Sequence, residues 1–201
     1  MKSPYHFLAK TYHFFEEVIF GSALQNCRTA FLSEIPPNAH VLSVGEGDGR
    51  FAQALLAQHP EVHLQVIEPD PAMRAQAQAK LPNLTFVANS TTCDILVLNF
   101  ILDLFTEEEA HRFLDQLPSA KTLIIGDFFP NKVNGPATRL TARLLTWTMY
   151  RFFRLTTGLK TKKIPPIEKI LTTEGWRLHQ ESPQWSGYIT AQLWMRRDKN
   201  N

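Results

Sequence analysis

The sequence of 201 residues lacks the features of several protein classes. It has only two cysteines, Cys27 and Cys93, and its seven histidines form no cysteine–histidine pairs at metal-ligand spacing. A disulfide framework is therefore excluded, a reducing compartment is favoured, and no metal site is expected. No apolar run approaches the roughly 20 residues that a membrane span requires. The first residues also lack the apolar core of a signal peptide, so we expect a cytoplasmic protein.

Charge is nearly balanced over the whole chain but unevenly distributed. The net charge is +2, so the composition carries no general signature of nucleic-acid binding, and no nucleic-acid partner is expected. The stretch 131–167, however, has eight basic residues and no acidic one. On a helix over 137–155, four arginines fall on one side and apolar residues occupy much of the opposite side: Arg139, Arg143, Arg151 and Arg154 against Leu145, Met149, Phe152 and Phe153.

Three interpretations of this basic helix remain open. It can cover the sheet with a solvated basic edge, or it can form a lid whose apolar side closes over a substrate cleft. It can also make peripheral contact with an anionic membrane surface.

One glycine-rich stretch, at 41–51, organises the rest of the chain. Residues 41–44 have the apolar, β-branched character of a buried parallel strand. Three glycines follow at alternate positions: Gly45, Gly47 and Gly49. Glycine permits both a tight turn and the close approach of a ligand to the backbone. A helix expected at 50–58 then offers unpaired N–H groups and the positive end of its dipole to that ligand.

The residues around this turn indicate which ligand it holds. The dinucleotide fingerprint G-x-G-x-x-G/A requires a small residue where this chain has Arg50. A second strand, predicted at 62–67, ends at Glu68, whose carboxylate can accept hydrogen bonds from both hydroxyls of a ribose. Together these features favour an adenosine-containing ligand that is not a dinucleotide.

Local signals place most of the remaining elements. Asp70 and Pro71 are typical of a helix start and predict a helix at 72–80, and Thr106 with Glu109 forms a capping box that opens another helix. Further strands are predicted from their apolar runs and turn residues: 84–88, 94–100, 122–126, and an antiparallel hairpin of 176–180 with 188–196.

The motif at 41–49 and the sequence Val66-Ile67-Glu68 resemble the first two motifs of the class I S-adenosylmethionine-dependent methyltransferases. Within that family, the ubiquinone/menaquinone-biosynthesis-type small-molecule enzymes are nearest in pattern. The resemblance implies an α/β, Rossmann-like fold with a seven-stranded doubly wound sheet of order 3-2-1-4-5-7-6, whose last strand is antiparallel. It also implies a single domain, 1–201, with an N-terminal helical cap at 1–35 and a helical insertion or lid at 131–164.

The resemblance further implies a set of residues that bind S-adenosylmethionine: Gly45, Glu46, Gly47, Gly49, Glu68, Pro69, Met73, Asn89, Ser90 and Asn99. Asn89 occupies the place of an aspartate that usually faces the adenine amino group, and its carbonyl can accept the same hydrogen bond. The connection from there to the strand at 94–100 is shorter than is usual in the family. Tyr12 lies in a segment similar to one in which a tyrosine covers the cofactor.

The chemistry implied is transfer of a methyl group from S-adenosylmethionine to a small, largely apolar acceptor. Such a displacement depends mainly on positioning and on exclusion of water, and a neutral nucleophile also needs a base. Asp103 is the favoured candidate, ahead of Asp127, Tyr12 and His13, because it follows the carboxyl end of a predicted strand.

Two other functions are compatible with the pattern. One is a binding or scaffold protein of the same fold that has lost methyl transfer. The other is a nicotinamide-dependent oxidoreductase, against which Arg50 argues. Methylation of nucleic acid is disfavoured because residues 99–102 lack the Asn/Asp-Pro-Pro-aromatic motif of the amino-methylating enzymes.

Overall fold

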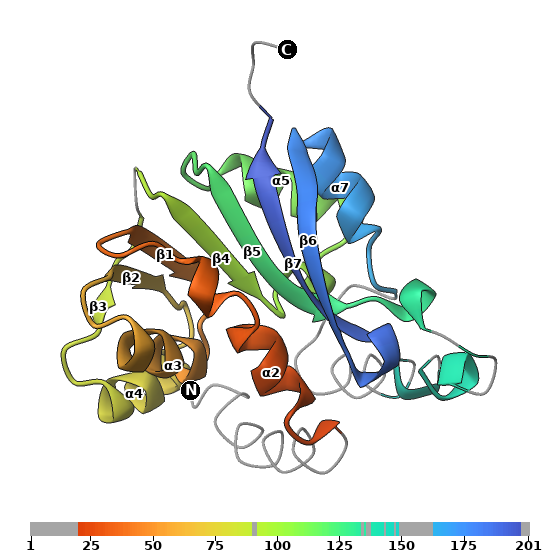
Figure 1. Ribbon diagram of the computed structural model, residues 1–201, viewed down its shortest axis with the longest axis horizontal. Coiled ribbons are helices and arrows are strands. Elements are labelled where there is room, and N and C mark those ends of the chain that lie inside the picture. Colours follow the sequence, from red (N-terminus) through yellow and green to blue (C-terminus); the bar gives the residue numbers. More distant parts are fainter. Residues whose placement is uncertain are drawn as a thin grey trace.

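The chain forms a seven-stranded mixed sheet flanked by helices. The computed structural model describes residues 20–89, 92–133, 135, 138–142, 144–146, 148 and 163–197. In this part of the chain the strands are β1 (His40–Val44), β2 (His63–Ile67), β3 (Thr85–Phe86), β4 (Ile95–Asn99), β5 (Thr122–Phe128), β6 (Trp176–Gln184) and β7 (Ile189–Arg196). Their order is β3-β2-β1-β4-β5-β7-β6 (Figure 1). β7 runs antiparallel to β5 and β6, so the predicted order and direction are confirmed.

The central strands are buried on both faces because alternate residues enter two separate cores. Val41 of β1 and Val97 of β4 pack toward α2 (Ala23–Thr29) and α3 (Arg50–Gln58). Leu42 and Leu98 pack on the other face, toward α5 (Glu107–Asp115) and α7 (Ile167–Thr173). Figure 1 shows α2, α3 and α4 (Pro71–Lys80) on one side of the sheet and α5 and α7 on the other. This is the doubly wound arrangement that a continuous apolar strand pattern predicts.

Two helices begin where their capping residues predict. Asp70 caps α4, and its carboxylate accepts hydrogen bonds from the N–H groups of Ala72 (2.8 Å) and Met73 (3.0 Å). Thr106 and Glu109 form the reciprocal contacts of a capping box at the start of α5. Each cap satisfies N–H groups that the first helical turn leaves unpaired.

Two strands are longer than predicted. β5 continues through Asp127 and Phe128, which pair with Thr190 and Ile189 of β7. The predicted end at residue 126 reflects the glycine there, but pairing with the neighbouring strand overrides this local turn signal. β6 likewise continues to Gln184, past a register shift between residues 178 and 180. A bulge of this kind lets a strand bend and still pair.

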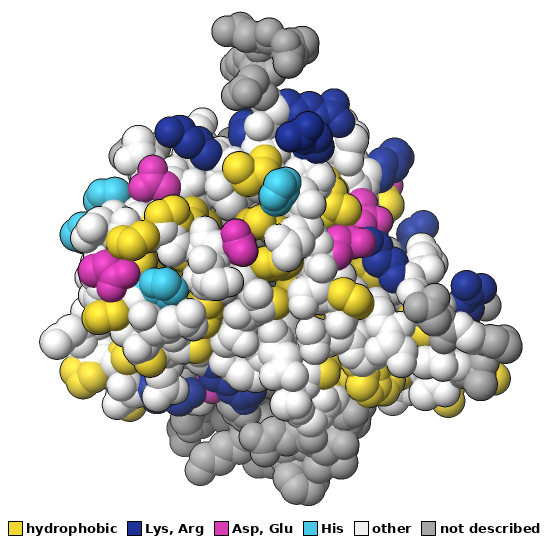
Figure 2. Space-filling view, in the orientation of Figure 1, with side chains coloured by type: hydrophobic (Ala, Val, Ile, Leu, Met, Phe, Trp, Pro, Cys, Tyr) yellow, Lys and Arg dark blue, Asp and Glu magenta, His cyan; other side chains and the backbone are white. Residues whose placement is uncertain are grey.

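The two predicted helical segments outside the sheet are described in part. Of the cap at 1–35, the structure describes α2 and a 3-10 helix, η1 (Leu32–Glu34). Of the insertion at 131–164, residues 138–142, 144–146 and 148 are helical, and we call them the insertion helix. Residues 1–19 of the cap and residues 134, 136–137, 143, 147 and 149–162 of the insertion lie outside the described chain and are grey in Figure 2. None of the described helices is both long enough and apolar enough to cross a bilayer.

Candidate functional site

The glycine turn lies at the carboxyl end of β1, where the chain passes into α3. All three glycines have a positive φ: +71° at Gly45, +68° at Gly47 and +86° at Gly49. The N–H of Gly45 donates to the carbonyl of Ile67 (2.8 Å), which joins the turn to the end of β2. Non-glycine residues rarely adopt such angles, so the alternate glycines are required by the shape of the turn itself.

Two of these glycines differ in what surrounds them. A Cβ on Gly49 would lie 2.9 Å from the Ala77 Cβ and 3.0 Å from its Cα, so α4 packs directly on the turn. A Cβ on Gly47 would have no described atom within 4 Å. Gly47 therefore faces open space, where a ligand can approach the backbone.

This difference predicts opposite effects of two alanine substitutions. Gly49→Ala should lower the free energy of unfolding by about 2–4 kcal/mol, because overpacking adds to the unfavourable φ. Gly47→Ala should cost only about 1 kcal/mol through its φ but should block a ligand that approaches the turn. Urea denaturation and ligand titration of both variants test the pair, and an equal loss of stability would contradict the geometry.

The structure brings Glu68 into direct contact with this turn. One oxygen of its carboxylate, Oε2, accepts from the N–H of Gly47 (2.7 Å), and Oε1 accepts from the N–H of Asp70 (2.8 Å). The residue is buried, and burial raises the pKa of its carboxyl group. Each carboxylate oxygen has two lone pairs, so both oxygens can accept one further hydrogen bond.

Glu46, also predicted to bind the cofactor, points toward the start of the following helix, α3. Its carboxyl group accepts from the Ser43 hydroxyl (2.5 Å) and from the N–H of Ala52 (2.8 Å) in the first turn of α3. Burial raises the pKa of Glu46 to about 7. These contacts stabilise the turn and occupy both oxygens with groups of the chain.

Asn99, at the carboxyl end of β4, carries an amide with unusual surroundings. Its Nδ2 and Oδ1 are buried and have no hydrogen-bond partner among the described residues. A Cβ on Gly126 of β5 would lie 2.8 Å from Asn99 Oδ1 and 2.8 Å from the Cys27 sulfur. The glycine thus makes room for the amide between the sheet and α2. A buried amide without a partner is costly in a folded protein unless a ligand or water satisfies it.

Helix α2 contributes two polar residues that the sequence did not single out. Gln25 Nε2 donates to the carbonyl of Arg50 (3.5 Å), and Gln25 Oε1 is buried with no partner among the described residues. The Arg28 guanidinium lies 4.9 Å from the centre of the Phe100 ring, beside the end of β4. The sequence pattern that could have indicated them is a pair of polar residues three positions apart in a helix that also carries apolar residues. In the structure, Ala23, Leu24 and Cys27 of that helix are buried.

Asp103 lies in the interior, in the 3-10 helix η2 (Leu102–Leu104) after β4. Its N–H donates to the carboxylate of Asp127 (3.3 Å), which also accepts from the N–H of Phe128 (2.8 Å). Burial raises the pKa of Asp103 to about 7 and raises that of Asp127 well above its usual range, with a further contribution from the charge of Asp103. Burial, together with the neighbouring negative charge, therefore favours a state in which at least one of the two carboxyl groups stays protonated.

The structure does not bring every predicted residue to the turn. Asn89 lines a pocket of about 230 Å³ with His40 and His63, the residues that begin β1 and β2. It therefore lies toward the amino ends of these strands, because the short connection must return the chain to the start of β4. Pro69 is exposed and Met73 is half-buried at the start of α4. Tyr12 and Ser90 lie outside the described residues.

A second, larger pocket of about 800 Å³ opens beyond the carboxyl end of β5. Its lining includes Phe128, Phe129 and the apolar stretch 164–167, with Lys132, Lys163 and Lys169 among its polar groups. The Phe128 ring lies 5.4 Å from the Phe100 ring, so this pocket adjoins the end of β4.

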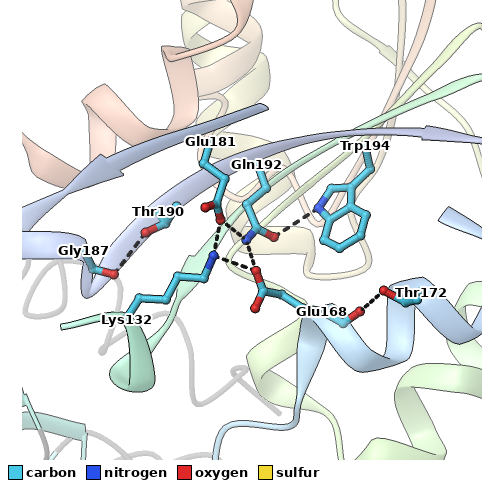
Figure 3. A network of polar contacts seen from close by, with 8 residues as sticks. All are labelled: Lys132, Glu168, Thr172, Glu181, Gly187, Thr190, Gln192 and Trp194. Atoms are coloured by element: carbon cyan, nitrogen blue, oxygen red, sulfur yellow. Dashed lines mark hydrogen bonds and ion pairs between the residues drawn. The ribbon is translucent and has the colours of Figure 1, made fainter. Parts of the chain in front are cut away.

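A polar network holds one wall of the larger pocket (Figure 3). The Lys132 ammonium pairs with Glu168 of α7 (2.6 Å) and with Glu181 of β6. Gln192 of β7 donates to the same two carboxylates (2.7 and 2.6 Å) and accepts from the Trp194 ring N–H (3.0 Å). Because each polar group has its partner, the network fixes the relative positions of α7, β6 and β7.

Solved structures share this architecture at low sequence identity. Mitomycin 7-O-methyltransferase MmcR matches with a TM-score of 0.66 and 16% identity, over 97% of this chain and 61% of that one. Magnesium protoporphyrin IX methyltransferase (ChlM) from Synechocystis PCC 6803, with bound SAH, matches with 0.62 and 17%, over 86% and 81%. The fold is that of the class I methyltransferases. The narrower prediction of a ubiquinone/menaquinone-type protein is not confirmed by these neighbours.

A third protein of the methyltransferase fold was solved with both a cofactor and a second ligand. This is NcsB1, an O-methyltransferase from neocarzinostatin biosynthesis, in complex with S-adenosylmethionine and 2-hydroxy-5-methyl naphthoic acid. It matches with a TM-score of 0.59 and 16% identity, over 86% of this chain and 54% of that one. This chain thus spans less than two thirds of MmcR and of NcsB1. Neither a family model nor a curated protein matches the sequence.

Proposed function

We propose that this chain is an S-adenosylmethionine-dependent methyltransferase that acts on a small acceptor with a largely apolar body. The observation that carries the proposal is the contact between Glu68 and the N–H of Gly47 (2.7 Å). It joins a carboxylate suited to ribose hydroxyls with an open backbone turn at a helix start. Arg50 occupies the third-glycine place of a dinucleotide site, which argues against a nicotinamide cofactor.

The residues at the turn fit the chemical groups of this cofactor. Glu68 would accept hydrogen bonds from the two ribose hydroxyls, and Gly47 leaves room for the adenosine beside the backbone. The buried amide of Asn99 and the Gln25 carbonyl would satisfy their missing hydrogen bonds on the amino-acid end. The Arg28 guanidinium supplies a positive charge near that end for its carboxylate. When bound, the cofactor supplies an electrophilic methyl group.

The larger pocket is the proposed place of the acceptor. Its aromatic and proline lining suits a flat apolar body. Lys132 and Lys169 pair with glutamates, so Lys163 is the lining residue proposed to meet an acidic substituent on that body. This proposal is supported by the naphthoic acid found in NcsB1, a protein of the same fold.

Asp103 remains the proposed base for a neutral acceptor. A pKa of about 7 would allow its carboxylate to take up a proton near neutral pH. The segment that carries it packs on the turn, since a Cβ on Gly45 would lie 2.6 Å from the Ile101 side chain. The N–H of Asp103 donates to Asp127, the residue before the pocket-lining Phe128. Asp103 therefore lies between the proposed cofactor site and the larger pocket.

Transfer of label from S-adenosylmethionine tests the proposal. The protein is incubated with methyl-labelled cofactor and a panel of phenols, aromatic acids and cell extract. We expect label in a product that extracts into organic solvent. The Gly47→Ala variant serves as the control and should give none. Absence of labelled product with every acceptor, together with no binding of the cofactor, would refute the proposal.

A second candidate is a protein of this fold that binds the cofactor without transferring its methyl group. The position of Asn89 favours it, because the short β3–β4 connection places that residue away from the turn. Tight binding of S-adenosylhomocysteine without any labelled product would support this second function over the first.

A further inference from the structure

The insertion helix exposes two large apolar side chains on its outer side. Leu140 is 70% exposed and Leu144 is 62% exposed, one helical turn apart. Among the described residues only Leu104, at 40%, joins them as an exposed large hydrophobic side chain. Two largely exposed leucines one turn apart form an apolar strip, and an exposed apolar surface of this kind can mark an interaction site.

The inner side of the same helix is anchored to the domain. Ala142 is fully buried, and the Thr146 hydroxyl lies 2.7 Å from the hydroxyl of Tyr188, the residue before β7. Leu145 packs against the core, as its predicted place on the apolar side requires. These contacts determine which side of the helix faces the domain, and Leu140 and Leu144 therefore face outward.

The strip lies in the most one-sidedly charged part of the sequence. Residues 131–167 include eight basic residues and no acidic one, and Arg139 is exposed beside the leucines. Arg143 and Arg151, which belong to the same basic stretch of the sequence, lie outside the described residues.

We propose that the outer side of the insertion helix docks on an anionic lipid bilayer. The leucines would enter the boundary between headgroups and acyl chains, and the basic residues would lie among the lipid phosphates. The positive charge favours an anionic lipid surface over a second copy of the chain as the partner, because two copies would bring the same positive surfaces together. The inference is independent of the proposed enzymatic function.

Sedimentation of the full chain with lipid vesicles tests this inference. We compare vesicles of phosphatidylcholine alone with vesicles of equal parts phosphatidylcholine and phosphatidylglycerol. The partition coefficient should be at least about tenfold higher for the anionic vesicles and should fall as salt is raised. The double variant Leu140→Ser/Leu144→Ser should lower binding to anionic vesicles by about tenfold or more.

The control is Leu104→Ser, which removes an exposed leucine outside the basic stretch and should bind anionic vesicles as the unmodified chain does. Thermal unfolding of both variants checks that they are folded, which the exposure of the substituted side chains favours. Equal binding to both kinds of vesicle, or unchanged binding of the double variant, would overturn the proposal. So would a dimer in solution that the double variant splits into monomers, because the strip would then be a self-association surface.

Discussion

Replacing Glu68 with glutamine should weaken the binding of S-adenosylhomocysteine by about 100-fold or more. The carboxylate accepts from the N–H groups of Gly47 and Asp70 and, in the proposed complex, from two ribose hydroxyls as well. Glutamine has one oxygen and one NH₂ group, so in either orientation the NH₂ group would face a backbone N–H, that of Gly47 or that of Asp70. Hydrogen bonds to a charged group contribute about 1.5–3 kcal/mol each, and the loss of two accounts for the expected factor. Isothermal titration calorimetry measures the change.

Glu61→Gln is the matched control for Glu68→Gln. Glu61 precedes β2, is only half-buried and pairs with His59 away from the turn, so its amide variant should bind the ligand normally. The melting temperature of each variant separates a lost ligand contact from a disrupted turn. Unchanged affinity in a folded Glu68→Gln variant would contradict the assignment of Glu68 to the ribose.

Asp103→Asn should reduce the loss of stability that accompanies a rise in pH. Burial raises the folded-state pKa of Asp103 from 3.8 to about 7, so the folded protein holds a proton that the unfolded chain releases. The stabilisation is complete below the unfolded-state pKa and is lost as the pH rises toward 7. One pKa unit corresponds to about 1.4 kcal/mol, so the unmodified chain should lose about 1–3 kcal/mol more than the variant between pH 5 and pH 8.

Urea denaturation at several pH values measures this difference. Asp115→Asn, which changes an exposed carboxylate at the end of α5, is the control and should follow the unmodified chain. If Asp103→Asn and the unmodified chain lost the same stability over this interval, Asp103 would not hold the extra proton.

Much of the fold could be predicted because its signals are local. The start of α3 at Arg50 follows from the glycine turn, and the start of α4 follows from the Asp70 cap. Apolar runs located the central strands, and the strand order came with the resemblance to the methyltransferase family. Glu68 was found because a carboxylate at a strand end next to a glycine turn has few other roles, and its contact with Gly47 confirms that the two meet.

The rest depended on contacts between distant segments. No local pattern shows that the Asp127 carboxylate accepts a hydrogen bond from the N–H of Asp103, because that contact joins two neighbouring strand ends. Gln25 and Arg28 belong to a helix whose apolar pattern predicts only packing, and their proximity to Arg50 and Phe100 is tertiary. The path of the β3–β4 connection likewise places Asn89 beside His40, where sequence spacing alone put it at a strand tip.

The identity of the ligand at the glycine turn decides whether the proposed function holds. Calorimetric titration of the unmodified chain with S-adenosylhomocysteine and, separately, with NADH tests it. We expect one S-adenosylhomocysteine site that the Glu68→Ala substitution removes, and no heat of binding with NADH. No binding of S-adenosylhomocysteine at millimolar concentration, or equal binding by the Glu68→Ala variant, would contradict the account.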